Sequence, residues 1–506
     1  MLSEPGALQS AKVDLCWSKV DLCSRMDEQQ PLLLQLPDPC LMAVLLCLSD
    51  DSTSLYSAAR AHSRLQQAAV LVLNNISTSV KTQQQLDNSL LPYMTKHGQH
   101  VGHIILEGPE PHEIVSLRQL PSMSTLTSLA CSNLGLQLQA GDGVQGVLGT
   151  AGLPLKQLQL EHCALRDGAQ GLAAALSLLP ELKQLSACWL RSKRFHFPTE
   201  ALQQLPQLTS LKLAGFRLQC GPDQSSCDLA PLRALTRLVE LDLSLVSNVA
   251  VTAAALSSLC FLTCLRLSVS NDVETGALAG KTRLQHLQLE SCRIAGAAAG
   301  VAQLLSQLQH LQQLTHLTLA CSLVTVGEDN PPATAYSVLT ASSTLQHLDV
   351  CGCTMPIGVW QHIFPAGRQL PHLQSLNISS VRQPDGDQSA APDGNRLVSC
   401  CPGLQDLEMR FLPCNAQQLA PLSGLSGLSA LTLCLSDGPW LGLATQCTGQ
   451  LTGLRELAVR MPEAAEAEGL LLQLTQLQQL TVLECWMGGA LFAVVFESKV
   501  RPGPSA

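Results

Sequence analysis

Residues 284–290 of the chain read LQHLQLE, residues 314–320 read LTHLTLA and residues 345–351 read LQHLDVC. These phrases share the pattern L-x-x-L-x-Φ, in which Φ is an aliphatic or small residue. The pattern occurs fourteen times, at a mean interval of about 27 residues, and every copy has Leu at its first and fourth positions. The copies begin at Leu126, Leu155, Leu182, Leu208, Leu238, Leu262, Leu284, Leu314, Leu345, Leu373, Leu404, Leu428, Leu454 and Leu477, and a weaker copy begins at Val101.

Alternation within the pattern predicts a short strand. The fourth and sixth positions point to one side, which is buried, and the third, fifth and seventh point to the other, which faces solvent. Between the strands, Gly168–Leu179 and Ala297–Leu311 are rich in Ala and Leu at helical spacing, so we expect them to pack behind the strands. One repeat cannot bury its own leucines, but stacked neighbours can, which predicts a curved solenoid with a concave parallel sheet.

The repeats resemble those of the leucine-rich repeat family over about residues 100–487. The resemblance implies an α/β solenoid, a horseshoe of about 14 to 15 repeats with a concave parallel β-sheet, helices or irregular turns on the convex side and a small N-terminal helical module. The ninth position, often Asn in this family, holds Cys163, Cys292, Cys353 and Cys485 in four copies. We expect these thiols to fill buried turns, and redox sensing is the alternative.

The composition predicts an aliphatic core and excludes several classes of protein. Aromatic residues are 3% of the 506, charged residues are 14%, and the net charge is −9, which argues against a nucleic-acid partner. The longest apolar runs are about half of a membrane span, so no membrane partner is expected. The 21 cysteines are scattered without a C-x-x-C pair, and no signal peptide is visible. A cytoplasmic or nuclear protein is expected, or alternatively one of the cytoskeleton or the ciliary axoneme.

Patterns typical of enzymes are absent or fail on their context. Residues 141–146 read GDGVQG, which matches a dinucleotide-binding loop, but the glycines and proline that follow oppose the helix such a loop needs. His97, His100 and His103 are evenly spaced, but glycines between them interrupt any helix that would present them together. We therefore expect no catalysis, no cofactor and no bound metal.

Side chains predicted on the concave face form a candidate binding surface. His286, His316 and His347 occupy the third position of three consecutive repeats and should form a ladder about one strand spacing apart. The candidate partner-binding residues are Lys212, Asp242, Arg266, His286, Glu290, His316, His347, Asp349, Asn377 and Glu408. If they bind a partner, protonation of three adjacent imidazoles as the pH falls towards 6 should change its affinity.

The alternative for these residues is purely structural. Lys212, Asp242 and Arg266 would only pair laterally across strands, with each pair contributing under about 1 kcal/mol. The histidines would only repeat a copied Q-H-L phrase.

A different segment precedes the repeats. Residues 36–65 contain two predicted amphipathic helices separated by Asp50 and Asp51. This segment resembles the F-box, which implies docking on the Skp-type adaptor of a cullin–RING ubiquitin ligase. Pro39 stands where that family usually has an acidic residue, and His62 stands about where it usually has Trp. The candidate adaptor-binding residues are Leu36, Pro37, Leu41, Val44, Leu45, Leu48, Leu55, Ala59 and Arg60. The alternative is that the helices only cap the first repeat.

The predicted organisation has five parts. They are a disordered leader over 1–30, an F-box-like helical module over 31–75, a helical N-terminal cap or linker over 76–100, leucine-rich repeats over 101–487, and a C-terminal cap and tail over 488–506. The predicted function is that of a substrate-recognition subunit of an SCF-type ubiquitin ligase, which binds a target protein on the concave face. The alternative is a structural scaffold of the cytoskeletal or axonemal type, with no ligase role.

Overall fold

The computed structural model describes residues 75–495, except for 110–114, 119, 122, 139–145, 149–152, 189–195, 216, 219–226, 245, 247–248, 269–271, 275, 296, 324–329, 384–390, 411–419, 435–450, 452, 462–478 and 488–489. The chain divides into two units, Met1–Asn75 and Ile76–Ala506. The F-box-like residues from Leu36 to Arg60 and most of the GDGVQG loop lie outside the described residues.

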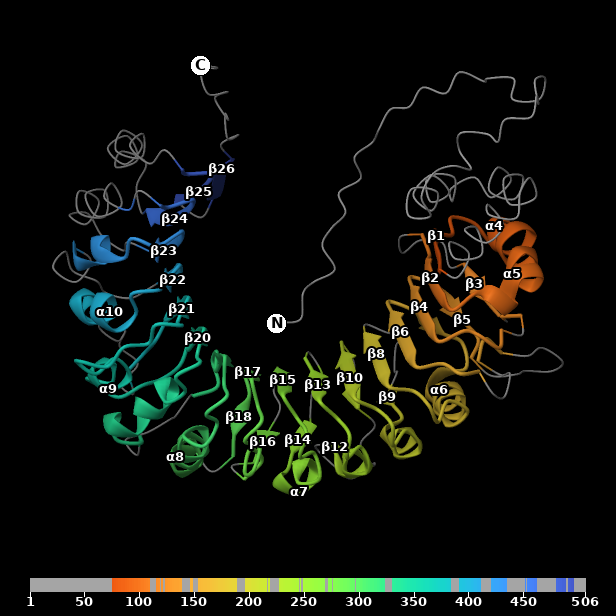
Figure 1. Cartoon of the computed structure of the whole chain (residues 1–506), viewed down its shortest axis with the longest axis horizontal. Helices are drawn as coiled ribbons and strands as arrows, with labels where there is room; N and C mark the ends of the chain where they lie inside the picture. Colours follow the sequence, from red (N-terminus) through yellow and green to blue (C-terminus); the bar gives the residue numbers. More distant parts are fainter. Residues whose placement is uncertain are drawn as a thin grey trace, which may run out of the picture. The chain divides into compact units, whose positions relative to one another are not determined.

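One sheet of 17 strands runs through the second unit (Figure 1). Each strand from β2 to β24 pairs in parallel with the strand of the next repeat. The strands are β1 (Asn75–Ser79), β2 (His103–Glu107), β4 (Ser128–Ser132), β6 (Gln157–Glu161), β8 (Gln184–Cys188), β10 (Ser210–Ala214), β13 (Glu240–Leu243), β15 (Cys264–Ser268), β17 (His286–Glu290), β19 (His316–Thr318), β20 (His347–Asp349), β21 (Ser375–Asn377), β22 (Asp406–Met409), β23 (Ala430–Cys434), β24 (Glu456–Met461), β25 (Val482–Met487) and β26 (Ala490–Val495). β26 pairs antiparallel with β25.

The strand register confirms the repeat pattern. Leu287 pairs with Leu317, which pairs with Leu348, and each of these fourth-position side chains is at most 1% exposed. The same correspondence between fourth positions holds from Ile104 in β2 to Leu457 in β24. Because fourth- and sixth-position side chains stack from one repeat to the next, they form one continuous aliphatic core. The fold is a leucine-rich repeat solenoid.

The last repeat corrects the prediction. Leu457 pairs with Leu483, so the fourteenth copy begins at Leu480, three residues later than the predicted start at Leu477. The spacing L-x-x-L occurs twice in succession here, and either phase satisfies it. Cys485 pairs with Val459 and therefore occupies the sixth position, where the prediction placed it at the ninth.

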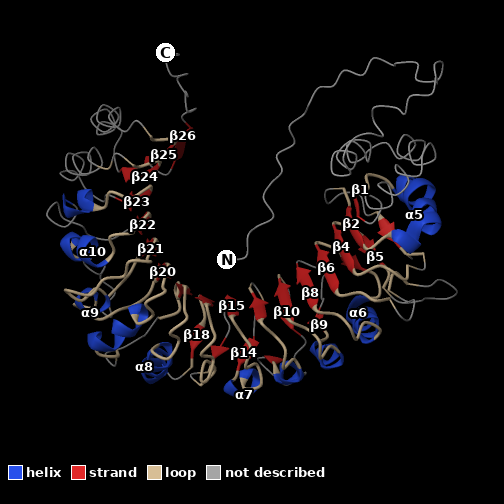
Figure 2. Cartoon of the chain, viewed as in Figure 1, coloured by secondary structure: helices blue, strands red, loops and turns tan. Residues whose placement is uncertain are grey.

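Helical segments lie along the outer side of the sheet, as Figure 2 shows. Those over the repeats are α6 (Gly168–Ser177), η4 (Thr199–Gln204), η5 (Ala230–Ala234), α7 (Ala253–Leu256), α8 (Ala297–Leu308), η6 (Ala333–Thr340), α9 (Trp360–Ile363), α10 (Gly394–Cys400) and η7 (Ala420–Gly424). Before the repeats lie α4 (Gln83–Gln85), η2 (Leu86–Leu90), α5 (Leu91–His97) and η3 (Gly98–His100). The predicted helices at 168–179 and 297–311 are confirmed as α6 and α8, each ending two or three residues earlier. No helix within the described ranges has the length and apolar character needed to cross a membrane.

Short second strands form three further parallel sheets between the main strands and the helices. They are β3 (Ser116–Leu117), β5 (Gly135–Leu136) and β7 (Ala164–Leu165) in one sheet; β9 (His196–Phe197) and β11 (Arg217–Leu218) in another; and β12 (Cys227–Asp228), β14 (Val249–Val251), β16 (Asp272–Val273) and β18 (Arg293–Ile294) in the third. By pairing between neighbouring repeats, these short strands fix the backbone between the main strands and the convex side.

Candidate protein-binding face

A left-handed residue at the eighth position turns the chain away from the main sheet. Among the described residues, seven at this position have positive φ angles: Asn133, His162, Gly215, Ser291, Cys321, Gly352 and Ser380. The turn places the ninth side chain in the core. The Cys163 Sγ lies 3.2 Å from the Cys131 carbonyl oxygen, and the Cys353 Sγ lies 3.0 Å from that of Leu319.

Ser322 makes the same bond more strongly. Its hydroxyl donates to the Leu289 carbonyl at 2.7 Å and accepts from the backbone N–H of Cys292 at 3.0 Å. Cys163, Cys353 and Ser322 at the ninth position thus bind the sixth-position carbonyl of the preceding repeat, whereas the Cys292 thiol contacts the Glu290 carbonyl of its own repeat. Burial raises the pKa of Cys292 and of Cys353 to about 12, so these thiols stay protonated and the structural interpretation is favoured over redox sensing.

A second ladder, at the second position, was missed in the sequence. Hydroxyl groups there donate to the second-position carbonyl of the preceding repeat, as Thr315 does to Gln285 at 3.0 Å and Thr209 to Lys183 at 3.0 Å. Thr127, Thr263, Ser429 and Thr481 do the same. The recurrence of Thr or Ser directly after the first Leu is the signal that identifies it. The two ladders fix both ends of the strands and so position the side chains between them.

The register places all ten predicted partner-binding residues on the side of the sheet opposite the leucine core. Six of them lie in the fifth-position row that crosses the strands, in which Gln288 and Thr318 separate Arg266 from Asp349: Lys212, Asp242, Arg266, Asp349, Asn377 and Glu408. Glu290 lies at the seventh position of its repeat. Asp242 is only 5% exposed, so it positions its neighbours Arg266 and Ser244 and contributes little surface for a partner to contact. The remaining three are the histidines.

The three histidines form the predicted ladder. His316 pairs with both His286 and His347 in the strand register. Their rings are stacked, with centroids 4.3 Å apart for the first pair and 5.9 Å for the second. The Thr315 Oγ1 lies 2.9 Å from the His316 Nδ1.

The predicted protonation of the whole ladder near pH 6 is wrong. Burial first, and then the neighbouring His286 and His347, lower the pKa of His316 to about 4. Burial and the nearby Arg266 also lower the pKa of His286. The central imidazole is therefore neutral at pH 6, because a charge there is both desolvated and opposed by like charges.

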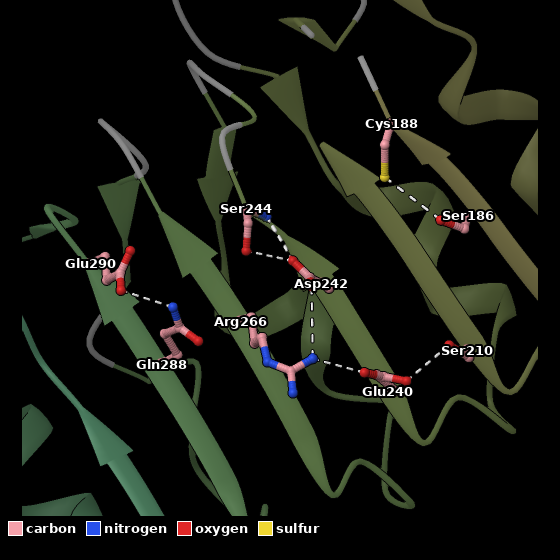
Figure 3. A network of polar contacts seen from close by, with 9 residues as sticks. All are labelled: Ser186, Cys188, Ser210, Glu240, Asp242, Ser244, Arg266, Gln288 and Glu290. Carbon is pink, nitrogen blue, oxygen red and sulfur yellow. Dashed lines mark hydrogen bonds and ion pairs between the residues drawn. The ribbon is translucent and has the colours of Figure 1, made fainter. Parts of the chain in front are cut away.

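Arg266 is the centre of a polar network beside the ladder (Figure 3). Its Nη1 lies 2.8 Å from the Glu240 Oε1 and 3.7 Å from the Asp242 Oδ2. Ser210 donates to the other oxygen of Glu240 at 3.0 Å, and Ser244 donates to Asp242 through its backbone N–H and its hydroxyl. The alternative of lateral ion pairing is thus correct for Asp242 and Arg266.

The network includes an ion pair that the prediction of pairing between neighbouring fifth-position residues did not contain. Glu240, the closest partner of Arg266, sits at the third position, diagonal to it, so a search along one row does not find it. Lys212, which pairs in register with Asp242, makes no ion pair with a described residue. The predicted lateral pairing of Lys212 is therefore wrong.

The carboxylates on the ladder strands and beyond them have mostly neutral partners. Asp349 accepts from the backbone N–H of Cys351 at 2.8 Å and from the Asn377 amide at 3.2 Å. Burial raises its pKa. Burial also raises the pKa of Glu408, although Arg410 lies 2.8 Å from that carboxylate and opposes the shift. Gln288 donates to Glu290 at 2.9 Å.

The described part of the chain contains no group of three or more His, Cys, Asp or Glu arranged to hold a metal ion. What the face offers is rows of charged and hydrogen-bonding groups, which suit contact with another macromolecule.

Comparison with known proteins gives one curated relative and a set of solved structures. No protein family model matches the sequence. The chain is 27% identical over 345 residues to the ribonuclease inhibitor of Sus scrofa, covering 66% of this chain and 67% of that protein. Among solved structures it is similar to the leucine-rich repeat protein LIC12759 of Leptospira interrogans, with a TM-score of 0.46 at 16% identity over 80% of this chain and 99% of that one. The internalin inlF of Listeria monocytogenes has a TM-score of 0.43 at 17% identity, over 72% and 88% of the two chains.

Proposed function

We propose that this chain is an adaptor that captures a target protein on the concave face of its sheet. The observation that supports this most is the in-register series of polar side chains from β10 to β22, which contains a cation at Arg266, the stacked histidines and the carboxylates of Asp349 and Glu408. Strands about 4.8 Å apart present these groups as parallel rows, which a partner can contact over many residues at once. The role is one of binding and positioning, without a bond made or broken by this chain.

The relative in the pig supports a role of the same kind. Its name says that it inhibits a ribonuclease, so it acts on another macromolecule. We carry over the mode of action, binding to another protein, and leave the identity of the target open.

We further propose that the N-terminal segment links the captured target to a ubiquitin ligase. Residues 36–65 resemble an F-box in the opening Leu36-Pro37 and in the aliphatic face that includes Leu45. An F-box followed by leucine-rich repeats is a familiar order. In this proposal the segment binds a Skp-type adaptor of a cullin–RING ligase, and the concave face holds the target for ubiquitination.

A second candidate is a structural scaffold of the cytoskeletal or axonemal type. The departures at Pro39 and His62 favour it, because these positions differ from the usual F-box pattern. In that case the N-terminal helices only cap the first repeat and no ligase is bound.

Co-purification of the full-length chain with a Skp-type adaptor separates the two candidates. The double variant Leu36→Asp with Leu45→Asp should lose the adaptor while the circular dichroism spectrum stays unchanged. A matched control is Leu178→Asp with Val239→Asp, which adds the same two charges at side chains that are each 38% exposed in the repeats. Retention of the adaptor by the control alone supports the ligase role, whereas no association of the wild type at micromolar concentration supports the scaffold.

The concave face is tested by a photo-crosslinking residue placed in the full-length protein. Thr318 lies two residues after His316 in β19 and pairs in register with Gln288 and Asp349, and Gln203 lies on the opposite side in η4. A protein crosslinked from position 318 and not from position 203 supports capture on the concave face. Crosslinking from position 203 alone, or from neither position, contradicts it.

A further inference from the structure

We infer that the target held on the concave face is a basic segment, rich in Lys and Arg, of a separate protein. The inference rests on the proposed function, since it names the chemistry of the partner that the face captures. It comes from the distribution of charge over the sheet, from the partners of individual carboxylates, and from the charge of the competing occupants.

Carboxylates outnumber cations on the concave face. The described third-, fifth- and seventh-position side chains of β2 to β24 include nine carboxylates and three cations. The carboxylates are Glu107, Glu161, Glu240, Asp242, Glu290, Asp349, Asp406, Glu408 and Glu456, and the cations are Lys212, Arg266 and Arg410. The full sequence of unit 76–506 has 31 Asp and Glu against 25 Lys and Arg, so the unit as a whole is acidic as well.

Ion pairs neutralise only part of this surplus. Arg266 is shared by Glu240 and Asp242, and Arg410 pairs with Glu408. Glu290, Asp349 and Asp406 accept from neutral donors instead, which are the Gln288 amide at 2.9 Å, the Asn377 amide at 3.2 Å and the Ser375 hydroxyl at 3.1 Å. Neutral donors orient a carboxylate without removing its charge, so these three retain both charge and acceptor capacity for an incoming cation.

The histidine ladder lies among these carboxylates, and its central imidazole adds no opposing charge. Glu290 is on the first ladder strand, Asp349 is on the last, and Asp406 pairs in register with Ser375 one strand beyond the ladder. His316 is uncharged at neutral pH because it is desolvated and stacked between its neighbours. The aliphatic stem of a Lys or Arg packs against the stacked rings while its charged end reaches a carboxylate.

Charge also argues against two occupants of the face that come from this chain itself, its N-terminal unit and a second copy. Residues 1–75 contain eight Asp and Glu against five Lys and Arg, so the N-terminal unit is acidic. A second copy carries a net charge of −9. Both oppose the field of the face, and like charges across an interface disfavour association. A separate basic protein is the occupant that complements it.

The probe for the test is a fluorescein-labelled peptide of six Lys-Ser repeats, measured against a Glu-Ser peptide of equal length by fluorescence polarisation with the full-length protein. The concave variant combines Glu290→Gln, Asp349→Asn and Asp406→Asn. The control variant combines Glu181→Gln, Glu200→Gln and Asp272→Asn, which removes three exposed carboxylates from turns, η4 and β16. All substitutions are nearly isosteric, and unchanged thermal unfolding verifies that both variants fold.

The wild type should bind the Lys-Ser peptide and not the Glu-Ser peptide. The concave variant should bind about tenfold more weakly, and the control variant within about twofold of the wild type. Raising the salt from 50 to 300 mM should weaken wild-type binding more than binding by the concave variant, since screening acts on exposed charges.

Equal weakening in both variants overturns the inference, because the peptide would then respond to total charge alone. Self-association of the wild type that the concave variant abolishes also overturns it, in favour of a second copy. A target crosslinked from position 318 whose affinity is the same for wild type and concave variant overturns the basic partner while leaving capture on the concave face intact. Failure of any protein to crosslink from position 318 refutes the proposed function itself.

Discussion

The imidazole of His316 stacks on that of His286, with ring centroids 4.3 Å apart, and this contact belongs to an environment that lowers the pKa of both side chains. On the other side His316 faces His347, while Arg266 and Glu240 lie near His286. The central imidazole, His316, is therefore neutral through the physiological range.

Binding of the Lys-Ser peptide should fall below about pH 5. Two titrations act in the same direction there: His316, with a pKa of about 4, gains a positive charge, and Asp349 and Glu408, whose pKa values burial raises, lose negative charge. Fluorescence polarisation at half-unit steps measures the profile. Binding that stays constant below pH 5 would contradict control by these groups.

The pKa of His286 should respond in opposite directions to two nearly isosteric variants. Burial is the main cause of its lowered pKa, Arg266 lowers it further, and Glu240 raises it. Arg266→Gln should therefore raise the pKa, and Glu240→Gln should lower it. The chemical shift of the ring Cε1–H during an NMR titration reports the value, and His310, on the convex side after α8, serves as the unaffected reference. A shift of the same sign in both variants would mean that repacking, not charge, controls the site.

Gly352→Ala should destabilise the solenoid through two separable effects. Gly352 has φ of 67°, where a non-glycine residue costs about 1–2 kcal/mol, and a Cβ there would meet the Cys321 Sγ. Cys321→Ala should recover the steric part of the loss and leave the backbone part. A double-mutant cycle by urea unfolding measures the coupling, and additivity of the two substitutions would exclude the steric contact.

Ser322→Ala should lower the free energy of unfolding by about 1–3 kcal/mol. The change leaves the Leu289 carbonyl and the Cys292 N–H unpaired in the core of two repeats. Ser177→Ala is the control, because that exposed hydroxyl bonds only to the Ala174 carbonyl of its own helix. Urea unfolding of both variants gives the comparison, and equal stabilities would show that the ninth-position ladder contributes little.

The stacking of the repeats could be predicted from the sequence because it depends on a short, repeated apolar spacing. Paired leucines define the register of one repeat on the next, as Leu287, Leu317 and Leu348 show. The prediction slipped only at Leu477, Leu480 and Leu483, where three equally spaced leucines satisfy the pattern in two phases. Strand pairing, which extends over six residue pairs there, selects between them.

The rows of the candidate face followed from the same register, but their electrostatics did not. The pKa of His316 depends on burial and on two neighbours about 30 residues away along the chain, which residue identity alone does not quantify. Arg266 pairs diagonally with Glu240 more closely than with Asp242 beside it, because the reach of the guanidinium decides the partner. Diagonal contacts between side chains of neighbouring repeats therefore become predictable only when the side-chain conformations are known.

The reversal of chain direction at β26 restricts how this array can vary in length. A unit duplicated before β25 finds a parallel neighbour on both sides and lengthens the array, whereas a unit appended after β26 meets a strand running the opposite way. Insertions and losses of whole repeats during evolution should therefore occur before β25. The β25–β26 pair should be kept together as one unit.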